Sequence, residues 1–315
     1  MLAAITGGTG FIGKKLVARL LERGDTVRLL TRSVTPGENS LPVEIHSCDL
    51  LTAGVADIST VLDGVEVLYH CAGQLRDTNI MRALHVDVTH KLVEAASGRV
   101  GHWVQLSSVG VYGSAAQEVI TEDSILAPVG EYEITKAESD QIVVEAANRG
   151  GFSCSVLRPS NVFGAGMSNQ SLFSLIAMIE RGLFFYIGRP GASANYLHVN
   201  NVVEGLICCG TMRAAKGRMY NLSDHCTMER FIAIIARALG KDAPRLRLPE
   251  PVVRALVRLL GDIPGVPLTE ARVNALTSRA VYPNTRIERE LGYCHQVTME
   301  KGLLELLASW RQQRQ

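Results

Sequence analysis

In about the first 160 residues, short apolar runs alternate with longer segments in which apolar residues recur every three or four positions. The short runs predict buried strands, and the longer segments predict amphipathic helices. The predicted strands cover residues 3–6, 27–31, 43–46, 65–71, 103–107 and 155–157, and the predicted helices cover 11–23, 81–96 and 132–148. Such alternation is typical of repeated β-α-β units around a parallel sheet.

After residue 159 the alternation fades, and loops with Gly and Pro separate isolated amphipathic helices. These helices are predicted at 172–181, 228–239, 251–260 and 299–310. We therefore predict an α/β fold: a doubly wound parallel sheet of the Rossmann type with a smaller, mostly α-helical C-terminal lobe. The predicted boundaries are 1–163 for the sheet domain, with a return segment near 195–222, and 164–194 with 223–315 for the second lobe.

Composition excludes several classes of protein. Apolar residues make up 47% and charged residues 20%, which argues against disorder, collagen and coiled coil. The balance of 32 basic and 31 acidic residues leaves a net charge of +1, so no overall field favours nucleic acid. Arginines interrupt the apolar stretch 252–260, which is far shorter than the ~20 residues that span a bilayer.

The start of the chain and its cysteines bear on location and on metals. An apolar strand is predicted almost from the first residue, so we expect no cleavable leader and a cytoplasmic location. The seven cysteines are scattered and show no C-x-x-C spacing. We expect them to be reduced and mostly buried, with no metal site.

The most specific motif lies in residues 2–13, LAAITGGTGFIG, where an apolar strand runs into glycines and then into a helix. Gly7, Gly10 and Gly13 permit a tight turn and close approach of the backbone to a pyrophosphate. The amide groups around Phe11 and Ile12 would then face the phosphates at the positive end of the helix dipole. The sheet domain is therefore predicted to bind a dinucleotide.

The end of the second strand bears on which dinucleotide binds. A site for NAD usually has an acidic residue there to bind the adenosine ribose, whereas this strand ends in Thr31 and Arg32. An arginine can form a charge-assisted fork with a 2′-phosphate, or it can stack on adenine. We therefore predict NADP as the preferred cofactor, and NAD remains possible.

A tyrosine, a lysine and a serine form the candidate chemistry. Tyr132 and Lys136 are four residues apart and so project from one face of the predicted helix. An adjacent ammonium is the kind of neighbour that lowers the pKa of a tyrosine toward the range of acid/base catalysis. Ser108 follows the fifth strand, at the edge of the sheet where open α/β folds bind ligands. Alternatively, this serine only caps the following loop.

The order of these motifs resembles that of the extended short-chain dehydrogenases/reductases, and among them the NAD(P)-dependent epimerase/dehydratase group. The resemblance covers essentially the whole chain. It rests on Gly7/Gly10/Gly13, Asp49–Leu50, His70-Cys71-Ala72-Gly73, Ser108 before VYG, Tyr132-x-x-x-Lys136, Leu157-Arg158-Pro159, and the stretches 195–206, 220–224 and 289–293.

The resemblance implies a role for each matching residue. Tyr132 would be the acid/base, Lys136 would bind the nicotinamide ribose and tune the tyrosine, and Ser108 would orient the reacting oxygen. The remaining implied contacts are with the cofactor: Asp49 and Leu50 with adenine, and Ala72 and Gly73 behind the fourth strand.

Departures from the family narrow the expected reaction. Dehydratases of the family carry Thr-Asp-Glu where this chain has Ser108-Val109-Gly110, so we disfavour dehydration. His85 stands at the place of a family asparagine, and it either contacts substrate as a second acid/base or keeps a structural hydrogen bond. By the same resemblance, Asn161 and Arg279 match positions that often contact the diphosphate of a nucleotide sugar, although a family arginine before Tyr196 is missing.

The leading hypothesis is an NAD(P)-dependent enzyme that reduces, or epimerises through, a keto group of a nucleotide-diphosphate sugar, such as a 4-keto-6-deoxyhexose. The alternatives are a hydroxysteroid-type dehydrogenase that acts on an apolar secondary alcohol, and a non-catalytic dinucleotide-binding regulator. In this family two long helices often pair across a two-fold axis, so we expect a homodimer formed through 81–96 and 132–148.

Overall fold

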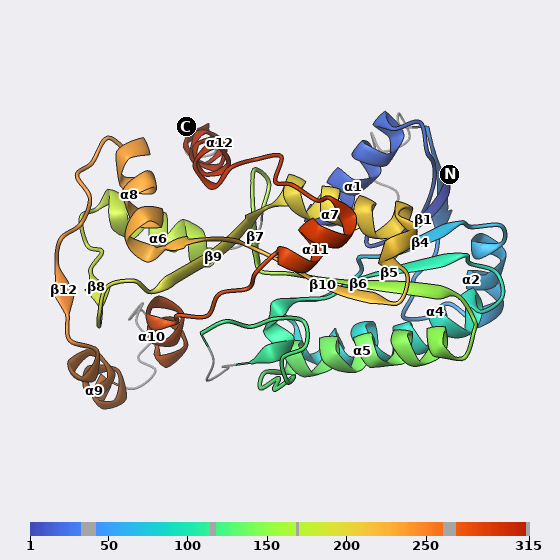
Figure 1. Ribbon diagram of the computed structural model, residues 1–315, viewed down its shortest axis with the longest axis horizontal. Coiled ribbons are helices and arrows are strands. Elements are labelled where there is room, and N and C mark those ends of the chain that lie inside the picture. Colours follow the sequence, from blue (N-terminus) through green and yellow to red (C-terminus); the bar gives the residue numbers. More distant parts are fainter. Residues whose placement is uncertain (33–41, 114–117, 168–169, 261–268, 313–315) are drawn as a thin grey trace.

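A seven-stranded, entirely parallel sheet organises the N-terminal two thirds of the computed structural model (Figure 1). The structure describes residues 1–32, 42–113, 118–167, 170–260 and 269–312. The strand order is β10-β6-β5-β4-β1-β2-β3. The strands are β1 Leu2–Thr6, β2 Thr26–Thr31, β3 Val43–Ser47, β4 Val67–His70, β5 His102–Leu106, β6 Ser153–Pro159 and β10 Arg218–Leu222.

Helices cover both faces of this sheet (Figure 1). One face carries α1 (Phe11–Glu22), α7 (Val199–Thr211) and α11 (Thr285–Leu291), and the other carries α2 (Val55–Leu62), α4 (Val88–Ala96) and α5 (Glu131–Asn148). The chain builds outward from β1 in one direction and from β4 in the other, so β1 and β4 flank the switch point. Doubly wound sheets bind ligands at the carboxyl ends of the strands at this point.

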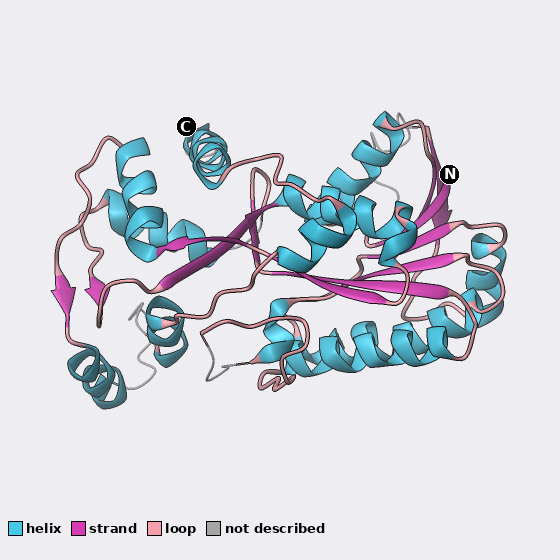
Figure 2. Cartoon of the chain, in the orientation of Figure 1, coloured by secondary structure: helices cyan, strands magenta, loops and turns pink. Residues whose placement is uncertain are grey.

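The C-terminal lobe combines helices with short strands (Figure 2), and it has its own hydrophobic core. This core lies among α6 (Gln170–Glu180), α8 (Met228–Ala238), α12 (Met299–Gln312) and the sheet formed by β7 (Asn161–Phe163), β9 (Ser193–His198) and β11 (Asp224–Thr227). A smaller cluster joins α9 (Glu250–Leu260) and α10 (Glu270–Thr277) to β8 (Tyr186–Ile187), which pairs with β12 (Arg247–Leu248).

The predicted fold class is confirmed, and all six predicted strands are present. The helix predicted over 81–96 is present, but it is not a regular α-helix throughout. That segment begins as α3 (Thr78–Arg82), passes through a π-helical turn (Ala83–Asp87) and continues as α4. The hydroxyl of Thr89 donates to the carbonyl of His85 at 2.6 Å, which satisfies one carbonyl of the widened turn. Apolar periodicity does not detect one inserted residue of this kind.

Two further expectations concern membranes and thiols. Within the described ranges, no helix has the length and apolar character that a membrane span needs. All seven cysteines are free thiols; four are buried and only Cys294 is exposed.

Candidate active site

The glycine turn packs backbone against backbone. Gly7 has a φ of +70°, and a Cβ there would lie 2.6 Å from the amide nitrogen of Ala72 at the end of β4. A Cβ on Gly13 would lie 2.2 Å from the carbonyl oxygen of Gly7. Only glycine fits at these two positions, because the turn, the start of α1 and the end of β4 meet there without room for side chains.

The start of α1 suits an anion. Its N-cap is Gly10, and no side chain caps the helix. The first amide groups of a helix have no partner within it, and they carry the positive end of the helix dipole. The turn and these amides therefore fit the diphosphate of a dinucleotide, the group that the glycine spacing predicts.

The other residues predicted to bind cofactor follow the carboxyl ends of β3 and β4, which lie on the two sides of β1 and β2 in the sheet. The carboxylate of Asp49, just beyond β3, accepts a hydrogen bond from the amide of Leu51 at 3.1 Å. The Leu50 side chain is buried in the core. The amide of Ala72 donates to the hydroxyl of Thr6 at 3.4 Å, and Gly73 is exposed.

Lys91 holds the loop that follows β3, and sequence analysis did not predict this contact. Its ammonium donates to the carbonyl oxygens of Leu50 at 2.7 Å, Leu51 at 3.0 Å and Ala53 at 3.2 Å. Arg32 is exposed at the end of β2, directly before residues 33–41, which lie outside the described ranges. Its proposed contact with a 2′-phosphate therefore stays a prediction.

Ser108, Tyr132 and Lys136 meet where β5 ends beside the first two turns of α5. The carboxylate of Glu133 accepts from the amides of Val129 and Gly130, and this fixes the first turn of the helix. One turn later, the buried ammonium of Lys136 donates to the carbonyl of Leu106, the last residue of β5.

Ser108 has the capping role considered for it, and its expected contact with the reacting oxygen of the substrate stays a prediction. Its hydroxyl caps the short helix that follows, accepting from the amide of Gly110 at 3.1 Å. The same side chain hydrogen-bonds the phenol of Tyr132. Since successive residues of an extended chain point to opposite sides, Ser107 turns away and donates to the buried carboxylate of Asp140 at 2.7 Å.

The predicted lowering of the Tyr132 pKa by Lys136 is not found. Burial raises the pKa of Tyr132 to about 12, and the hydrogen bond from Ser108 only partly opposes that increase. Burial also lowers the pKa of Lys136, against the opposing charge of Asp140. Tyr132 is therefore a neutral phenol near pH 7, because desolvation disfavours its charged form.

A buried ion pair links α5 to β6, and it too was not predicted. Arg158 and Asp140 are each about 2% exposed, with nitrogen and oxygen 3.2 Å apart. Arg158 also donates to the hydroxyl of Tyr112 at 3.0 Å, which donates in turn to Asn221 at 2.9 Å. Asp140 lies four residues after Lys136, a spacing that could have signalled it. The network ties α5 to β6 and β10.

A cavity of about 860 Å³ opens beside Tyr132 and Ser108. Asn161 and Arg279, predicted to bind substrate, also line it, and so does Asn195 at the place of the missing family arginine. Arg279 is exposed and donates to the carbonyl of Pro190 at 2.6 Å. Most of the side chains lining the cavity are polar, and its volume lies within the roughly 300–1,000 Å³ of small-molecule sites.

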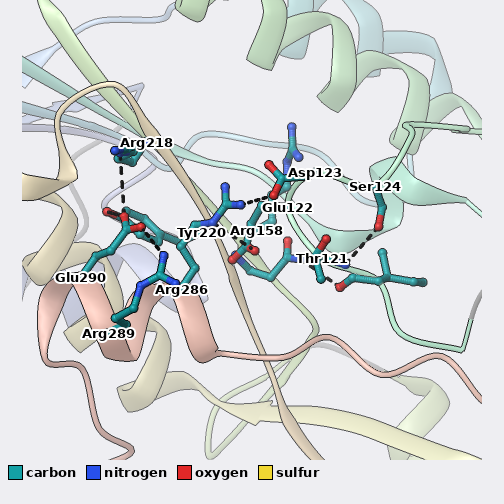
Figure 3. Close-up of polar contacts among 12 residues, drawn as sticks. Thr121, Glu122, Asp123, Ser124, Arg158, Arg218, Tyr220, Arg286, Arg289 and Glu290 are labelled. Atoms are coloured by element: carbon teal, nitrogen blue, oxygen red, sulfur yellow. Dashed lines mark hydrogen bonds and ion pairs between the residues drawn. The ribbon is translucent and has the colours of Figure 1, made fainter.

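The C-terminal wall of this cavity, residues 274–280 and 282, is joined to the loop that precedes α5. Backbone hydrogen bonds link Ile120 to Val281 at 2.9 Å and Val281 to Glu118 at 2.7 Å. Arg286 forms ion pairs with Glu122 and Asp123 on the same loop (Figure 3). The wall is thus attached to the sheet domain chiefly by irregular segments.

His85 lies apart from the cavity, inside the protein. Its side chain is 1% exposed, and both ring nitrogens have protein partners. Its ring meets that of Tyr132 edge-on, with centroids 5.7 Å apart. Across the described part of the chain, no cluster of His, Cys, Asp and Glu is arranged to hold a metal ion.

Comparisons with known proteins agree with this architecture. The chain is 28% identical over 323 residues to 4-hydroxy-2-methyl-3-oxo-4-farnesyl-3,4-dihydroquinoline-1-oxide ketoreductase from Stigmatella aurantiaca, covering 96% of this chain and 95% of that protein. It is 35% identical over 182 residues to dTDP-6-deoxy-L-talose 4-dehydrogenase (NAD(P)(+)) from Kitasatospora kifunensis, covering 55% of this chain and 56% of that one.

A solved structure shows the same fold. UDP-glucuronic acid 4-epimerase from Bacillus cereus, in complex with NAD, superimposes with a TM-score of 0.78 at 18% identity, and the match covers 100% of both chains. The family model for NAD dependent epimerase/dehydratase proteins matches residues 3–223, well over half of the sequence. The chain therefore belongs to the NAD dependent epimerase/dehydratase family.

Proposed function

We propose that the protein is an NAD(P)-dependent oxidoreductase that reduces a ketone to a secondary alcohol, or epimerises a carbinol centre through such a ketone. The observation that carries the proposal is the convergence of Ser108 and Tyr132 on one cavity, with Lys136 buried one helical turn behind the phenol. A tyrosine that is protonated at neutral pH suits donation of a proton to a forming alkoxide.

Each residue has a defined part in reduction. When bound, the nicotinamide supplies the hydride to the carbonyl carbon. The Ser108 hydroxyl, already hydrogen-bonded to Tyr132, orients the carbonyl oxygen. Tyr132 donates its proton to that oxygen as negative charge develops there, and Lys136 stabilises the resulting phenolate. Oxidation runs these steps in reverse, and an epimerase would use both directions in turn.

The substrate we propose is a nucleotide-diphosphate sugar. The polar lining suits a sugar, and Arg279 and Asn161 offer donors to a diphosphate within the same cavity. The Kitasatospora dehydrogenase, named for a dTDP-sugar, supports this choice. Loss of water remains disfavoured, because Val109 and Gly110 stand where dehydratases carry their acidic pair.

A second candidate is an apolar cyclic ketone or alcohol, as in the hydroxysteroid-type alternative. One observation favours it: among the described residues that line the cavity, Glu118 and Glu133 are acidic and Arg279 alone is basic, so this lining carries more negative than positive charge. A diphosphate would gain little binding free energy beside such a lining. The Stigmatella relative, named for a farnesylated dihydroquinoline oxide, also supports this candidate and matches nearly the whole chain.

The cofactor we propose is NADP, on the strength of Arg32 at the end of β2. The deciding experiment incubates the purified chain with NADPH or NADH and a panel of 4-keto-6-deoxy sugar nucleotides and of ketosteroids, and follows nicotinamide absorbance. Turnover of the sugar nucleotides, faster with NADPH, is expected. Turnover of the steroids alone would overturn the proposed sugar-nucleotide substrate. Cofactor binding with no turnover of any ketone or alcohol would favour the non-catalytic dinucleotide-binding regulator.

A further inference from the structure

The hydrogen bonds of His85 fix which of its nitrogens carries the proton. The amide of Gln74, in the loop after β4, donates to Nε2 at 2.9 Å. An amide is only a donor, so Nε2 must be the unprotonated acceptor and the ring proton must lie on Nδ1. Nδ1 then donates to the hydroxyl of Thr135 at 2.8 Å, and that hydroxyl donates to the carbonyl of Glu131 at 2.7 Å.

These hydrogen bonds join the loop after β4, whose start is predicted to bind cofactor, to α5, which carries Tyr132 and Lys136. Gly73 and Gln74 continue the strand end that faces the glycine turn, and a Cβ on Gly73 would lie 3.3 Å from Nε2 of His85. At the other end, Thr135 lies between Tyr132 and Lys136 on α5. The ring of His85 also packs edge-on against the phenol. One buried side chain therefore spans from the loop to the catalytic helix.

The widened turn of the preceding helix carries His85 at its centre. The turn covers Ala83–Asp87, and it is wider than a turn of a regular α-helix. Thr89 holds the freed carbonyl of His85, and it also contacts Ser139 of α5 at 3.0 Å. Such turns cost stability and are frequently found at functional sites.

We propose that His85, held as its neutral Nδ1–H tautomer, is a positioning residue that sets the Tyr132 phenol against the Gly73–Gln74 loop and exchanges no proton with substrate. The proposal rests on the proposed function. Both ring nitrogens are occupied within the protein, so neither is available to a substrate. Burial disfavours protonation of the ring, and the ammonium of Lys136 on α5 adds to that effect.

The first test reads the tautomer without any enzymatic assay. Nitrogen-15 spectra of the imidazoles in the full chain are expected to show His85 as Nδ1–H, with no titration between about pH 5 and pH 9. An Nε2–H tautomer, or titration within that range, would overturn the assignment. Because the spectra need no substrate, they stand even if the protein turns over no ketone.

The second test uses matched substitutions at the two ends of the hydrogen bond between His85 and Thr135. Thr135→Val and His85→Phe each remove it, and we expect kcat to fall about tenfold to a hundredfold with KM within about twofold, since the phenol is misplaced while the cavity is intact. Thr135→Ser keeps the hydroxyl and His85→Gln keeps one donor and one acceptor. Both are expected to recover most of the rate.

A buried histidine elsewhere is the control. His102, at the far end of β5, is 4% exposed and hydrogen-bonded to Ser153 and Ser155. His102→Phe is expected to lower the melting temperature as His85→Phe does while leaving kcat unchanged. An equal loss of kcat in His102→Phe would assign the effect to general destabilisation. Loss of activity in His85→Phe as complete as in Tyr132→Phe, with no recovery in His85→Gln, would make His85 a catalytic residue. Either result would overturn the proposal.

Discussion

The two walls of the cavity are built in different ways. On the sheet-domain wall, Ser108 and Tyr132 follow a central strand and begin a long helix, and the side chains behind them are buried and hydrogen-bonded. On the C-terminal wall, Arg279 is exposed on an irregular segment after α10, where it donates to the carbonyl of Pro190. We call the first the rigid wall and the second the adaptable wall. Under the proposed function, proton transfer takes place at the first and substrate choice at the second, in keeping with function grafted onto a fixed fold.

The largest expected effect is at the rigid wall. Tyr132→Phe removes the proton donor but keeps the ring that packs on His85. We expect kcat to fall by roughly 10²–10⁴-fold while NADPH binding and the melting temperature change little. Steady-state kinetics and cofactor titration by fluorescence measure this.

Tyr69→Phe is the matched control for that substitution. The Tyr69 hydroxyl is buried on β4 and has no hydrogen-bond partner within the described residues. Its removal should leave activity unchanged. Comparable losses in the two variants would show that the phenol of Tyr132 has no special part in the reaction.

The second effect is acid destabilisation of the sheet domain. Burial lowers the pKa of His70 and His85 to about 3 and that of His102 to about 4. Unfolded histidines titrate near 6.5, so between about pH 6.5 and pH 3 the unfolded chain binds more protons than the folded one. The free energy of unfolding should therefore fall as the pH decreases through that window, by on the order of several kcal/mol in total.

The two tryptophans report this change separately. Trp103 lies on β5 and Trp310 on α12, so Trp310→Phe leaves a single reporter in the sheet domain. Urea unfolding of that variant, followed by fluorescence at pH 7.5 and pH 5, is expected to show the loss of stability. Equal midpoints at the two pH values would refute the claim that buried neutral histidines stabilise this wall.

Sequence reasoning predicted most of the rigid wall because its signals are local. The glycine spacing, the four-residue step from Tyr132 to Lys136 and the serine at a strand end each lie within one element or turn. Even on this wall, sequence reasoning did not predict the effects of tertiary contacts. The π turn at His85 depends on contacts with α5, and the pKa of Tyr132 depends on burial by neighbours distant in sequence.

The adaptable wall was harder to predict. Asn161 and Arg279 line one cavity although more than a hundred residues separate them, and only the family resemblance pointed to both. Nothing in local periodicity predicts that Val281 pairs with residues 118–120 or that Lys91 holds the loop after β3. These contacts are set by where separate segments meet in space, so a single sequence carries little signal for them.

The third prediction tests whether the C-terminal wall binds a negatively charged group of the substrate. Arg279→Ala should raise KM for a sugar nucleotide by about tenfold to a hundredfold and leave kcat within a few-fold, since a charge-assisted hydrogen bond is worth about 1.5–3 kcal/mol. Arg279→Lys keeps the charge and should recover part of the loss. An unchanged KM in Arg279→Ala would weaken the sugar-nucleotide assignment and strengthen the apolar one.

The smallest effect concerns the ion pair between α11, just beyond the C-terminal wall, and the loop before α5 to which that wall is attached. Arg286 is about 22% exposed and Asp123 about 77%, so solvent screens their attraction (Figure 3). We expect Arg286→Ala, Asp123→Ala and the double variant to give a coupling free energy of only about 0–1 kcal/mol in urea unfolding. The backbone bonds between Val281 and residues 118–120 persist in all three variants, so kcat should not change. A coupling above about 2 kcal/mol, or a change in kcat, would mean that this wall is as firmly held as the catalytic one, and the contrast between them would fail.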